Sequence, residues 1–273
     1  PFMPIEFFKK HAIVSGSAKP QITFTSSGTT GTINSKHLIT DVSIYEASFK
    51  KAFELTYGNS TNYAVVALLP SYLERSGSSL IYMIDALIAA SKYPQQSGYF
   101  LYNHTDLANT LKTLQAQQKP TLLVGVTYAL LDFVESNPIN FPELIVMETG
   151  GMKGKRKEMI REALHHTLCA GFGVSAIHSE YGMTELLSQA YATSAGIFSC
   201  PPWMQVYIRD VNDPFTFLHE HRAGGINVID LANINSCSFI ATQDLGKKHA
   251  DNCFEVLGRF DNSDIRGCNL LVQ

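Results

Sequence analysis

The sequence predicts an α/β fold, in which a mainly parallel, helix-covered sheet is followed by a smaller β-rich region. Strand-like and helical segments alternate through the first two thirds of the chain, and after Ile177 they give way to short strands separated by turn residues. The 273 residues are 45% hydrophobic and 16% charged, a composition that supports a sizeable core. We expect an α/β core over residues 1–190 and a β-rich subdomain over residues 191–273.

Hydrophobic periodicity and turn residues place the elements of the first part. Asp41 is a good helix N-cap, and Phe49 and Phe53 lie one turn apart on the helix that follows it. The continuous apolar run at 63–69, which ends before Pro70, is typical of a strand buried on both faces. The predicted strands are 21–24, 63–69, 99–102, 122–126 and 144–147, and the predicted helices are 41–58, 78–91, 107–117 and 155–168.

The alternation of strands and helices also indicates where a ligand binds. Strands joined by helices form a parallel sheet, and the ligands of such sheets lie beyond the carboxyl ends of the strands. The last third of the chain instead predicts five short strands, at 205–209, 225–230, 238–241, 254–257 and 269–272.

Composition and charge exclude several classes of partner. The formal net charge is −3, so the basic surface that binds nucleic-acid backbones is not expected. The longest strongly apolar stretch, 121–131, is closed by Asp132, whereas a membrane span needs about 18 apolar residues. Five scattered cysteines and a start without a secretory signal favour the reducing cytoplasm.

A segment rich in hydroxyl groups and glycine, residues 25–32 (TSSGTTGT), follows the first predicted strand. Its glycines permit unusual backbone angles, and its hydroxyl and N–H groups can surround phosphate oxygens. The pattern is not the common P-loop, because Lys36 comes five residues after Gly31. By itself the segment fits a phosphate-binding loop and a solvated polar loop equally well.

A second cluster, residues 178–185 (HSEYGMTE), combines an aromatic ring, a glycine, a hydroxyl and two carboxylates. Tyr181 can stack on a base, Thr184 can bond a phosphate, and Glu185 offers the oxygen ligands that Mg²⁺ prefers. Taken alone, the cluster is explained better by a core aromatic at Tyr181 and a helix-start carboxylate at Glu185.

Together the two segments resemble the acyl-adenylate-forming superfamily, which contains acyl-CoA ligases, peptide-synthetase adenylation domains and luciferases. Five segments match its motifs in the same order along the chain, with Gln243 in place of a usual glycine. They are the phosphate loop at 27–31 (SGTTG), the adenine-contacting turn at 149–151 (TGG), the Tyr-Gly-x-Thr-Glu motif at 181–185 (YGMTE), the Thr-Gly-Asp element at 242–244 (TQD) and the Gly-Arg-x-Asp hinge at 258–261 (GRFD). The resemblance implies the fold of the N-terminal domain of adenylate-forming ligases.

Further segments narrow the resemblance to the acyl-protein synthetases of the LuxE type, the ligase subunits of the bacterial fatty acid reductase. These segments are 1–5 (PFMPI), 7–9 (FFK), 69–75 (LPSYLER) and 266–271 (RGCNLL). Phenylacetate-CoA ligases are related and share the Gly-Gly turn and the Arg-Gly ending. Adenylate-forming ligases usually carry a further C-terminal subdomain with a catalytic lysine, and we expect this chain to lack it.

The resemblance implies a role for each matched residue. The implied catalytic residues are Cys268, as the acyl acceptor, Thr184, and Glu185, which is also the Mg²⁺ ligand. A thiolate attacks an acyl-adenylate readily when cationic groups lower its pKa, and Arg259 and Arg266 are the nearest such groups in the sequence. The implied ATP-binding residues are Ser26, Ser27, Gly28, Thr29, Thr30, Gly31, Gly150, Gly151, Tyr181, Gly182, Asp244 and Arg259.

The implied reaction uses ATP and Mg²⁺ to activate a fatty or other hydrophobic carboxylate as acyl-AMP. The acyl group then passes to a cysteine thiol, for delivery to an acyl-CoA or aldehyde reductase subunit. Two alternatives stay open: a truncated phenylacetate-type acyl-CoA ligase, and a non-catalytic nucleotide-binding or scaffold subunit, marked by Gln243 and the missing lysine. The ligase hypothesis requires Thr29 and Glu185 to lie close enough to share one nucleotide.

Overall fold

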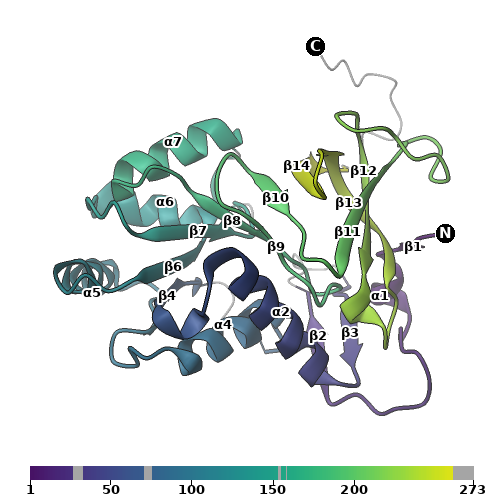
Figure 1. Cartoon of the computed structure of the whole chain (residues 1–273), viewed down its shortest axis with the longest axis horizontal. Helices are drawn as coiled ribbons and strands as arrows, with labels where there is room; N and C mark the ends of the chain where they lie inside the picture. Colours follow the sequence, from purple (N-terminus) through teal and green to yellow (C-terminus); the bar gives the residue numbers. More distant parts are fainter. Residues whose placement is uncertain (27–32, 71–75, 153–154, 158, 261–273) are drawn as a thin grey trace.

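The computed structural model describes residues 1–26, 33–70, 76–152, 155–157 and 159–260. Within these residues, one mixed sheet of 12 strands runs through the molecule, and a two-stranded hairpin lies beside it (Figure 1). The parallel part of the sheet carries helices on both faces, with α6 and α7 on one side and α2 and α4 on the other (Figure 1). The predicted α/β fold class is confirmed.

The described elements have the following bounds. The strands of the large sheet are β1 (Met3–Pro4), β4 (Ala64–Leu68), β5 (Gly98–Tyr99), β6 (Thr121–Val126), β7 (Ile145–Thr149), β8 (His178–Tyr181), β9 (Ala190–Ala192), β10 (Ile197–Ser199), β11 (Met204–Arg209), β12 (Ala223–Asp230), β13 (Phe239–Lys248) and β14 (Cys253–Arg259). The hairpin consists of β2 (Ile22–Thr25) and β3 (Lys36–Ile39). The helices are α1 (Phe7–Lys10), α2 (Val42–Tyr57), α4 (Ser79–Ala90), α5 (His104–Ala116), α6 (Thr127–Ser136) and α7 (Arg161–Phe172), with 3₁₀ turns η1 (Ser60–Asn62) and η2 (Leu231–Asn233).

The strand order divides the sheet into a parallel and an antiparallel half. Strands β5, β4, β6, β7 and β8 are parallel neighbours in this order. From β8 onward the neighbours β9, β10, β14, β13, β12 and β11 pair in antiparallel fashion. The carboxyl ends of β7 and β8 therefore lie side by side, next to the antiparallel half.

Local sequence signals explain several of these elements. Asp41 caps α2 by accepting a hydrogen bond from the Ser43 N–H, and Gly58 ends the helix at φ +76°, as the sequence predicts. Strands β4 and β6 consist of buried residues throughout. Gly125 in β6 lets α6 pack closely, because a Cβ there would lie 2.5 Å from the Leu130 side chain.

Helix α6 is an element that the sequence pattern did not predict. The apolar stretch 121–131 contains β6 and the first half of α6, without a turn residue between them. Most residues of α6 are themselves buried, so the helix largely lacks the polar face that marks an amphipathic helix.

Other boundaries also differ from the prediction. The helix predicted at 155–168 begins at Arg161, because Arg156 instead pairs with Asp132 and Glu135 of α6. The hairpin strand β3 and the short strands β9 and β10 were not predicted, since three- and four-residue strands carry little periodicity. The strand predicted at 269–272 lies outside the described residues.

Two apolar clusters form the core of the described residues. The larger one fills the space between the parallel strands and their helices. The smaller one lies under β11–β14 and includes Ile5 and Phe8 from the N-terminal segment together with Tyr181 and Leu186. The sheet continues across residue 190, and the domain boundary expected there stays a prediction.

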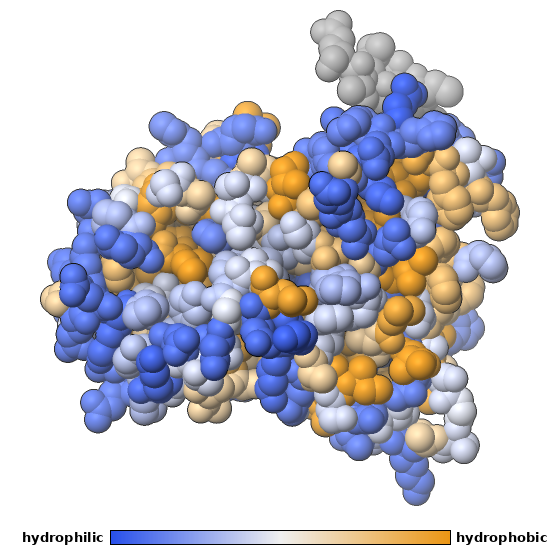
Figure 2. Space-filling view, viewed as in Figure 1, coloured by the Kyte–Doolittle hydropathy of each residue, from blue (hydrophilic) through white to orange (hydrophobic). Residues whose placement is uncertain are grey.

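The surface reflects the same arrangement. In Figure 2 the outer surface over the helices is mainly hydrophilic, while apolar side chains gather over the strands of the antiparallel half and the nearby N-terminal segment. Exposed apolar residues in these parts include Phe7, Phe217 and Phe239. Among the described residues, no helix has the length and apolar character needed to cross a membrane.

Candidate active site

Two of the matched segments meet at the carboxyl ends of β7 and β8. Gly150 and Gly151 follow β7 directly, with φ angles of +79° and +65°, a backbone region in which residues with a Cβ are strained. The Tyr-Gly-x-Thr-Glu segment begins at Tyr181, the last residue of β8, and continues beyond it. Because β7 and β8 are parallel neighbours, the Gly-Gly turn and this segment lie at one edge of the sheet.

The hydroxyl-rich loop leaves and rejoins the hairpin at a closed neck. The Ser26 N–H donates to the Ser35 carbonyl at 3.1 Å, and the Ser35 N–H donates to the Ser26 hydroxyl at 2.8 Å. Both residues continue the β2–β3 pairing, in which Thr25 lies opposite Lys36. Ser27, Gly28, Thr29, Thr30 and Gly31 lie outside the described residues.

This neck contacts the Tyr-Gly-x-Thr-Glu segment. The Ser35 side chain lies close enough to the Glu185 carboxyl to lower its pKa. Two residues farther along, the His37 Nδ1 lies 2.9 Å from the Thr184 carbonyl. The two segments on which the ligase hypothesis depends are therefore neighbours at the neck of the loop, although Thr29 itself lies outside the described residues.

The environment of Glu185 is suited to a carboxylate that binds a cation. It is 6% exposed, and burial raises its pKa above the usual value of 4.5. No described residue forms an ion pair with it. Magnesium in nucleotide sites commonly uses one or two carboxylates together with the phosphates of the substrate, so one carboxylate beside a phosphate loop fits this ion. The described residues contain no cluster of three metal-binding side chains.

The backbone that follows Glu185 is held by the turn between β12 and β13. The Asn233 side-chain amide donates to the Glu185 carbonyl at 2.7 Å. The buried Asp230 carboxylate accepts from the N–H groups of Leu187 and Ser188 at 2.9 Å each, and from the Ser188 hydroxyl. Hydrogen bonds to a buried charge fix a loop more firmly than neutral ones, so this segment has a defined position.

A third group joins Tyr181, Asp244 and Arg259. The Tyr181 hydroxyl donates to Asp244 Oδ2 at 2.9 Å, and Arg259 Nε lies 3.1 Å from Asp244 Oδ1. The Arg259 side chain is 73% exposed, whereas that of Asp244 is 9% exposed. Burial first, and then the charge of Asp244, raises the pKa of Tyr181 far above 10. The Tyr181 ring belongs to the smaller core, where it packs against Phe198 and Phe254, and Arg259 is the exposed member of the group.

The departure from the Thr-Gly-Asp pattern at Gln243 leaves this group intact. Gln243 and Asp244 are successive residues of β13, so their side chains point to opposite faces of the sheet. The Gln243 amide donates to the carboxylate of Glu6. A side chain at this position therefore contacts the N-terminal segment and not the carboxylate of Asp244.

Sequence reasoning gave no role to Glu180, which lies partly buried at the end of β8. Its Oε2 accepts from the Thr149 hydroxyl at 2.7 Å, and a Cβ on Gly182 would lie 2.2 Å from its Oε1. Burial, with a smaller effect of the nearby Glu148 carboxylate, raises the pKa of Glu180 to about 7. The sequence signal that could have identified Glu180 is its position directly before Tyr181 in a strand. No local sequence signal identifies His37, because its hydrogen-bond partners lie far away in the sequence.

The structure brings the described members of the predicted site into one connected set. Ser26, Thr184 and Glu185 belong to the neck region, and Gly150 and Gly151 join it through the neighbouring strand ends. The remaining described members are Tyr181, Gly182, Asp244 and Arg259. Cys268 and residues 27–31 lie outside the described residues.

Comparisons with known proteins agree with this geometry. The family model described as "Acyl-protein synthetase, LuxE" matches residues 1–273. No curated protein matches the sequence.

Among solved structures, ATP-bound MatB from Rhodopseudomonas palustris has a TM-score of 0.65 at 17% identity, with 90% of this chain and 49% of that chain covered. A long-chain-fatty-acid–CoA ligase from Archaeoglobus fulgidus has a TM-score of 0.60 at 15% identity (87% and 51%). O-succinylbenzoate coenzyme A synthetase from Bacillus subtilis, in complex with AMP, has a TM-score of 0.58 at 19% identity (92% and 51%). These likenesses show a shared fold, and this chain spans about half the length of each of these proteins.

Proposed function

Because the chain belongs to the LuxE family of acyl-protein synthetases, we propose that it is an ATP-dependent ligase that forms an acyl-AMP and passes the acyl group to a cysteine thiol. The observation that carries the proposal is the contact of the loop neck with Thr184 and Glu185, through Ser35 and His37. A phosphate loop and a buried carboxylate that meet at the carboxyl edge of a parallel sheet form a suitable site for a nucleotide and its cation.

The first half-reaction activates the acid. A carboxylate oxygen attacks the α-phosphorus of ATP, the bond from this phosphorus to the bridging oxygen breaks, and pyrophosphate leaves. In this proposal the N–H and hydroxyl groups of the loop bind the β- and γ-phosphates and stabilise the leaving group. The proposed contacts are residues 26–31 for the β- and γ-phosphates, Gly150, Gly151 and Tyr181 for adenine, Asp244 for the ribose, and Arg259 for the ribose or the α-phosphate.

Magnesium would be held by Glu185 together with phosphate oxygens, and it would neutralise the charge that develops on the phosphates. Burial raises the pKa of Glu185 and outweighs the smaller opposing effects of the Arg259 and Lys9 charges. A bound cation is expected to restore the ionised form, since an opposite charge in direct contact favours the carboxylate.

The second half-reaction transfers the acyl group. A thiolate attacks the carbonyl carbon of the acyl-AMP, the carbon–oxygen bond to the phosphate breaks, and AMP leaves, so that a thioester forms. The last described residues lie at the site, because Arg259 contacts Asp244 and the Phe260 N–H donates to the Gln243 carbonyl at 2.8 Å. Cys268 follows Phe260 by eight residues, which can span at most about 28 Å. The proposed acceptor is therefore within reach of the site.

The described cysteines are weaker candidates for the acceptor. Burial raises the pKa of Cys169 and raises that of Cys200 to about 12, and the thiolate is the reactive form. Cys237 and Cys253 also carry free thiols. The Cys237 carbonyl accepts from the same Asn233 amide that holds Glu185, so Cys237 is the natural control for Cys268.

The test combines pyrophosphate exchange with acyl labelling. The wild type is expected to catalyse carboxylate-dependent ATP–pyrophosphate exchange and to acquire a hydroxylamine-labile acyl label. Cys268→Ser should keep the exchange and lose the label, whereas Cys237→Ser should keep both. Labelling of Cys268→Ser at the wild-type level would show that the acceptor is another group, and absence of exchange with every acid tested would refute the ligase proposal.

Coenzyme A is the alternative acceptor, and the same assay distinguishes it. The solved neighbours include coenzyme A ligases about twice as long as this chain. Formation of acyl-CoA without a protein label would favour the phenylacetate-type alternative. The proposed recipient of a protein-bound acyl group is a reductase subunit, and transfer to such a partner can be followed as loss of label from this chain.

A further inference from the structure

We propose that His37 is a positioning residue for the ligase reaction, whose imidazole holds Thr184 at the neck of the phosphate loop and so directs the Glu185 carboxylate toward the cation and the triphosphate. The inference rests on the proposed function. It adds a residue that belongs to none of the five matched motifs.

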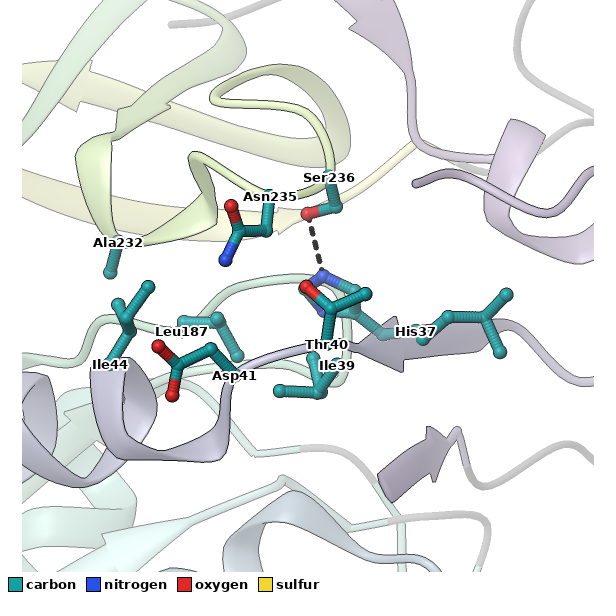
Figure 3. Close-up of a pocket in the computed structure, with 10 residues that line it drawn as sticks. His37, Ile39, Thr40, Asp41, Ile44, Leu187, Ala232, Asn235 and Ser236 are labelled. Atoms are coloured by element: carbon teal, nitrogen blue, oxygen red, sulfur yellow. Dashed lines mark hydrogen bonds between the residues drawn. The ribbon is translucent and has the colours of Figure 1, made fainter. Parts of the chain in front are cut away.

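The imidazole of His37 connects three distant segments of the chain. Its Nδ1 lies 2.9 Å from the Thr184 carbonyl, and its Nε2 lies 2.7 Å from the Ser236 hydroxyl (Figure 3). Their separations along the sequence are 147 and 199 residues. The side chain is fully buried, and the edge of the Phe8 ring packs against it with the ring centres 5.1 Å apart. Both polar atoms of the ring are therefore used inside the protein.

The two partners fix the tautomer. A carbonyl oxygen only accepts, so Nδ1 carries the hydrogen and donates to Thr184. Burial lowers the pKa of His37 to about 4, which keeps the ring neutral, and Nε2 accepts from the Ser236 hydroxyl. The Asn233 carbonyl, at 3.3 Å, is a longer alternative acceptor for the same hydroxyl. With one donor and one acceptor assigned, the ring has one orientation that satisfies both nitrogens.

These bonds hold the two successive peptide groups on either side of the Glu185 Cα. His37 binds the Thr184 carbonyl from β3, and Asn233 binds the Glu185 carbonyl at 2.7 Å from the turn that also carries Ser236. The Glu185 carboxyl lies near the side chain of Ser35, two residues before His37. Residues 35–37 thus lie against both the backbone before Glu185 and its carboxyl. A displacement of about 1 Å in such a group can lower a rate about 100-fold.

Two amide substitutions separate the two bonds of the ring. Asparagine places its amide nitrogen near the Nδ1 position, so His37→Asn can still donate to the Thr184 carbonyl. Glutamine places its amide near the Nε2 position, so His37→Gln reaches Ser236 and leaves Thr184 unpaired. His104→Asn is the matched control, because His104 lies on α5 and contacts the Phe133 ring outside the site.

The readouts are kcat, the KM for ATP and the half-saturating Mg²⁺ concentration in ATP–pyrophosphate exchange. His37→Asn is expected to keep kcat within about threefold of the wild type. His37→Gln should lower kcat by tenfold or more and raise the half-saturating Mg²⁺ concentration, with the KM for ATP changed by less than threefold. Nitrogen NMR of the imidazole in the metal-free wild type should show the Nδ1–H tautomer. His104→Asn should match the wild type.

Several results would overturn the role of His37. These are equal kcat values for the two His37 variants, a rise in the KM for ATP in place of the fall in kcat, or an Nε2–H tautomer in the wild type. If His37→Gln does not fold, Ser236→Ala tests the same point, because like His37→Asn it removes the bond to Ser236 and keeps the bond to Thr184. Its kcat should stay within about threefold of the wild type, and a tenfold fall overturns the role. Absence of exchange in the wild type instead overturns the proposed function itself.

Discussion

Replacement of Glu180 by glutamine should change how stability depends on pH. Glu180 is partly buried, and its pKa of about 7 exceeds the ordinary value of 4.5 because desolvation and the nearby Glu148 carboxylate disfavour the charged form. Between these two pH values the folded protein holds a proton that the unfolded chain has released. The stability that this group contributes is complete below about pH 4.5 and is lost as the pH rises to about 7.

The size of the effect follows from the two pKa values. One pKa unit corresponds to about 1.4 kcal/mol, so the loss between 4.5 and about 7 amounts to about 3 kcal/mol. Glu180→Gln keeps an oxygen that can accept from the Thr149 hydroxyl but carries no charge. We therefore expect the variant to gain about 2 to 3 kcal/mol relative to the wild type between about pH 5 and pH 8.

Urea unfolding of both proteins at several pH values measures this difference. Subtraction of the variant removes the contributions of other groups, such as His37, whose lowered pKa gives stability that is lost as the pH falls. Glu54→Gln is the control, because the Glu54 side chain is 55% exposed and pairs only with Lys51 on the surface. The reasoning is refuted if the difference in the free energy of unfolding between the wild type and Glu180→Gln stays constant within about 0.5 kcal/mol over this pH range.

Two further predictions concern the carboxylates that hold the site together. Asp244→Asn removes the negative charge of the carboxylate that accepts from Tyr181 and that we assign to the ribose. The KM for ATP in pyrophosphate exchange should therefore rise by about tenfold or more. An unchanged KM contradicts the assignment. Asp230→Ala leaves the Ser188 N–H without an acceptor in the interior and leaves the Leu187 N–H with Asn233 Oδ1 alone. The free energy of unfolding should fall by about 2 to 4 kcal/mol, whereas a loss below about 1 kcal/mol in urea unfolding would show that the segment after Glu185 does not depend on Asp230.

Predictions from sequence succeeded where the signal is local. The caps Asp41 and Gly58 define α2, and the apolar run at 63–69 contains β4, because capping and burial on both faces depend on neighbouring residues. They failed at α6, where the apolar stretch contains a strand and a buried helix. A helix that is buried on most sides loses the periodicity that distinguishes it from a strand.

The alternation of strands and helices along the chain predicted the α/β class, which the structure confirms. The matched motifs led us to assign the phosphate loop, Tyr181, Glu185 and Asp244 to the site, because such motifs are properties of short segments. Only the tertiary structure decided that Ser35 and His37 contact Glu185 and Thr184. Hydrogen bonds between segments more than a hundred residues apart depend on how the hairpin packs against the sheet, and no local pattern records which side chains meet there.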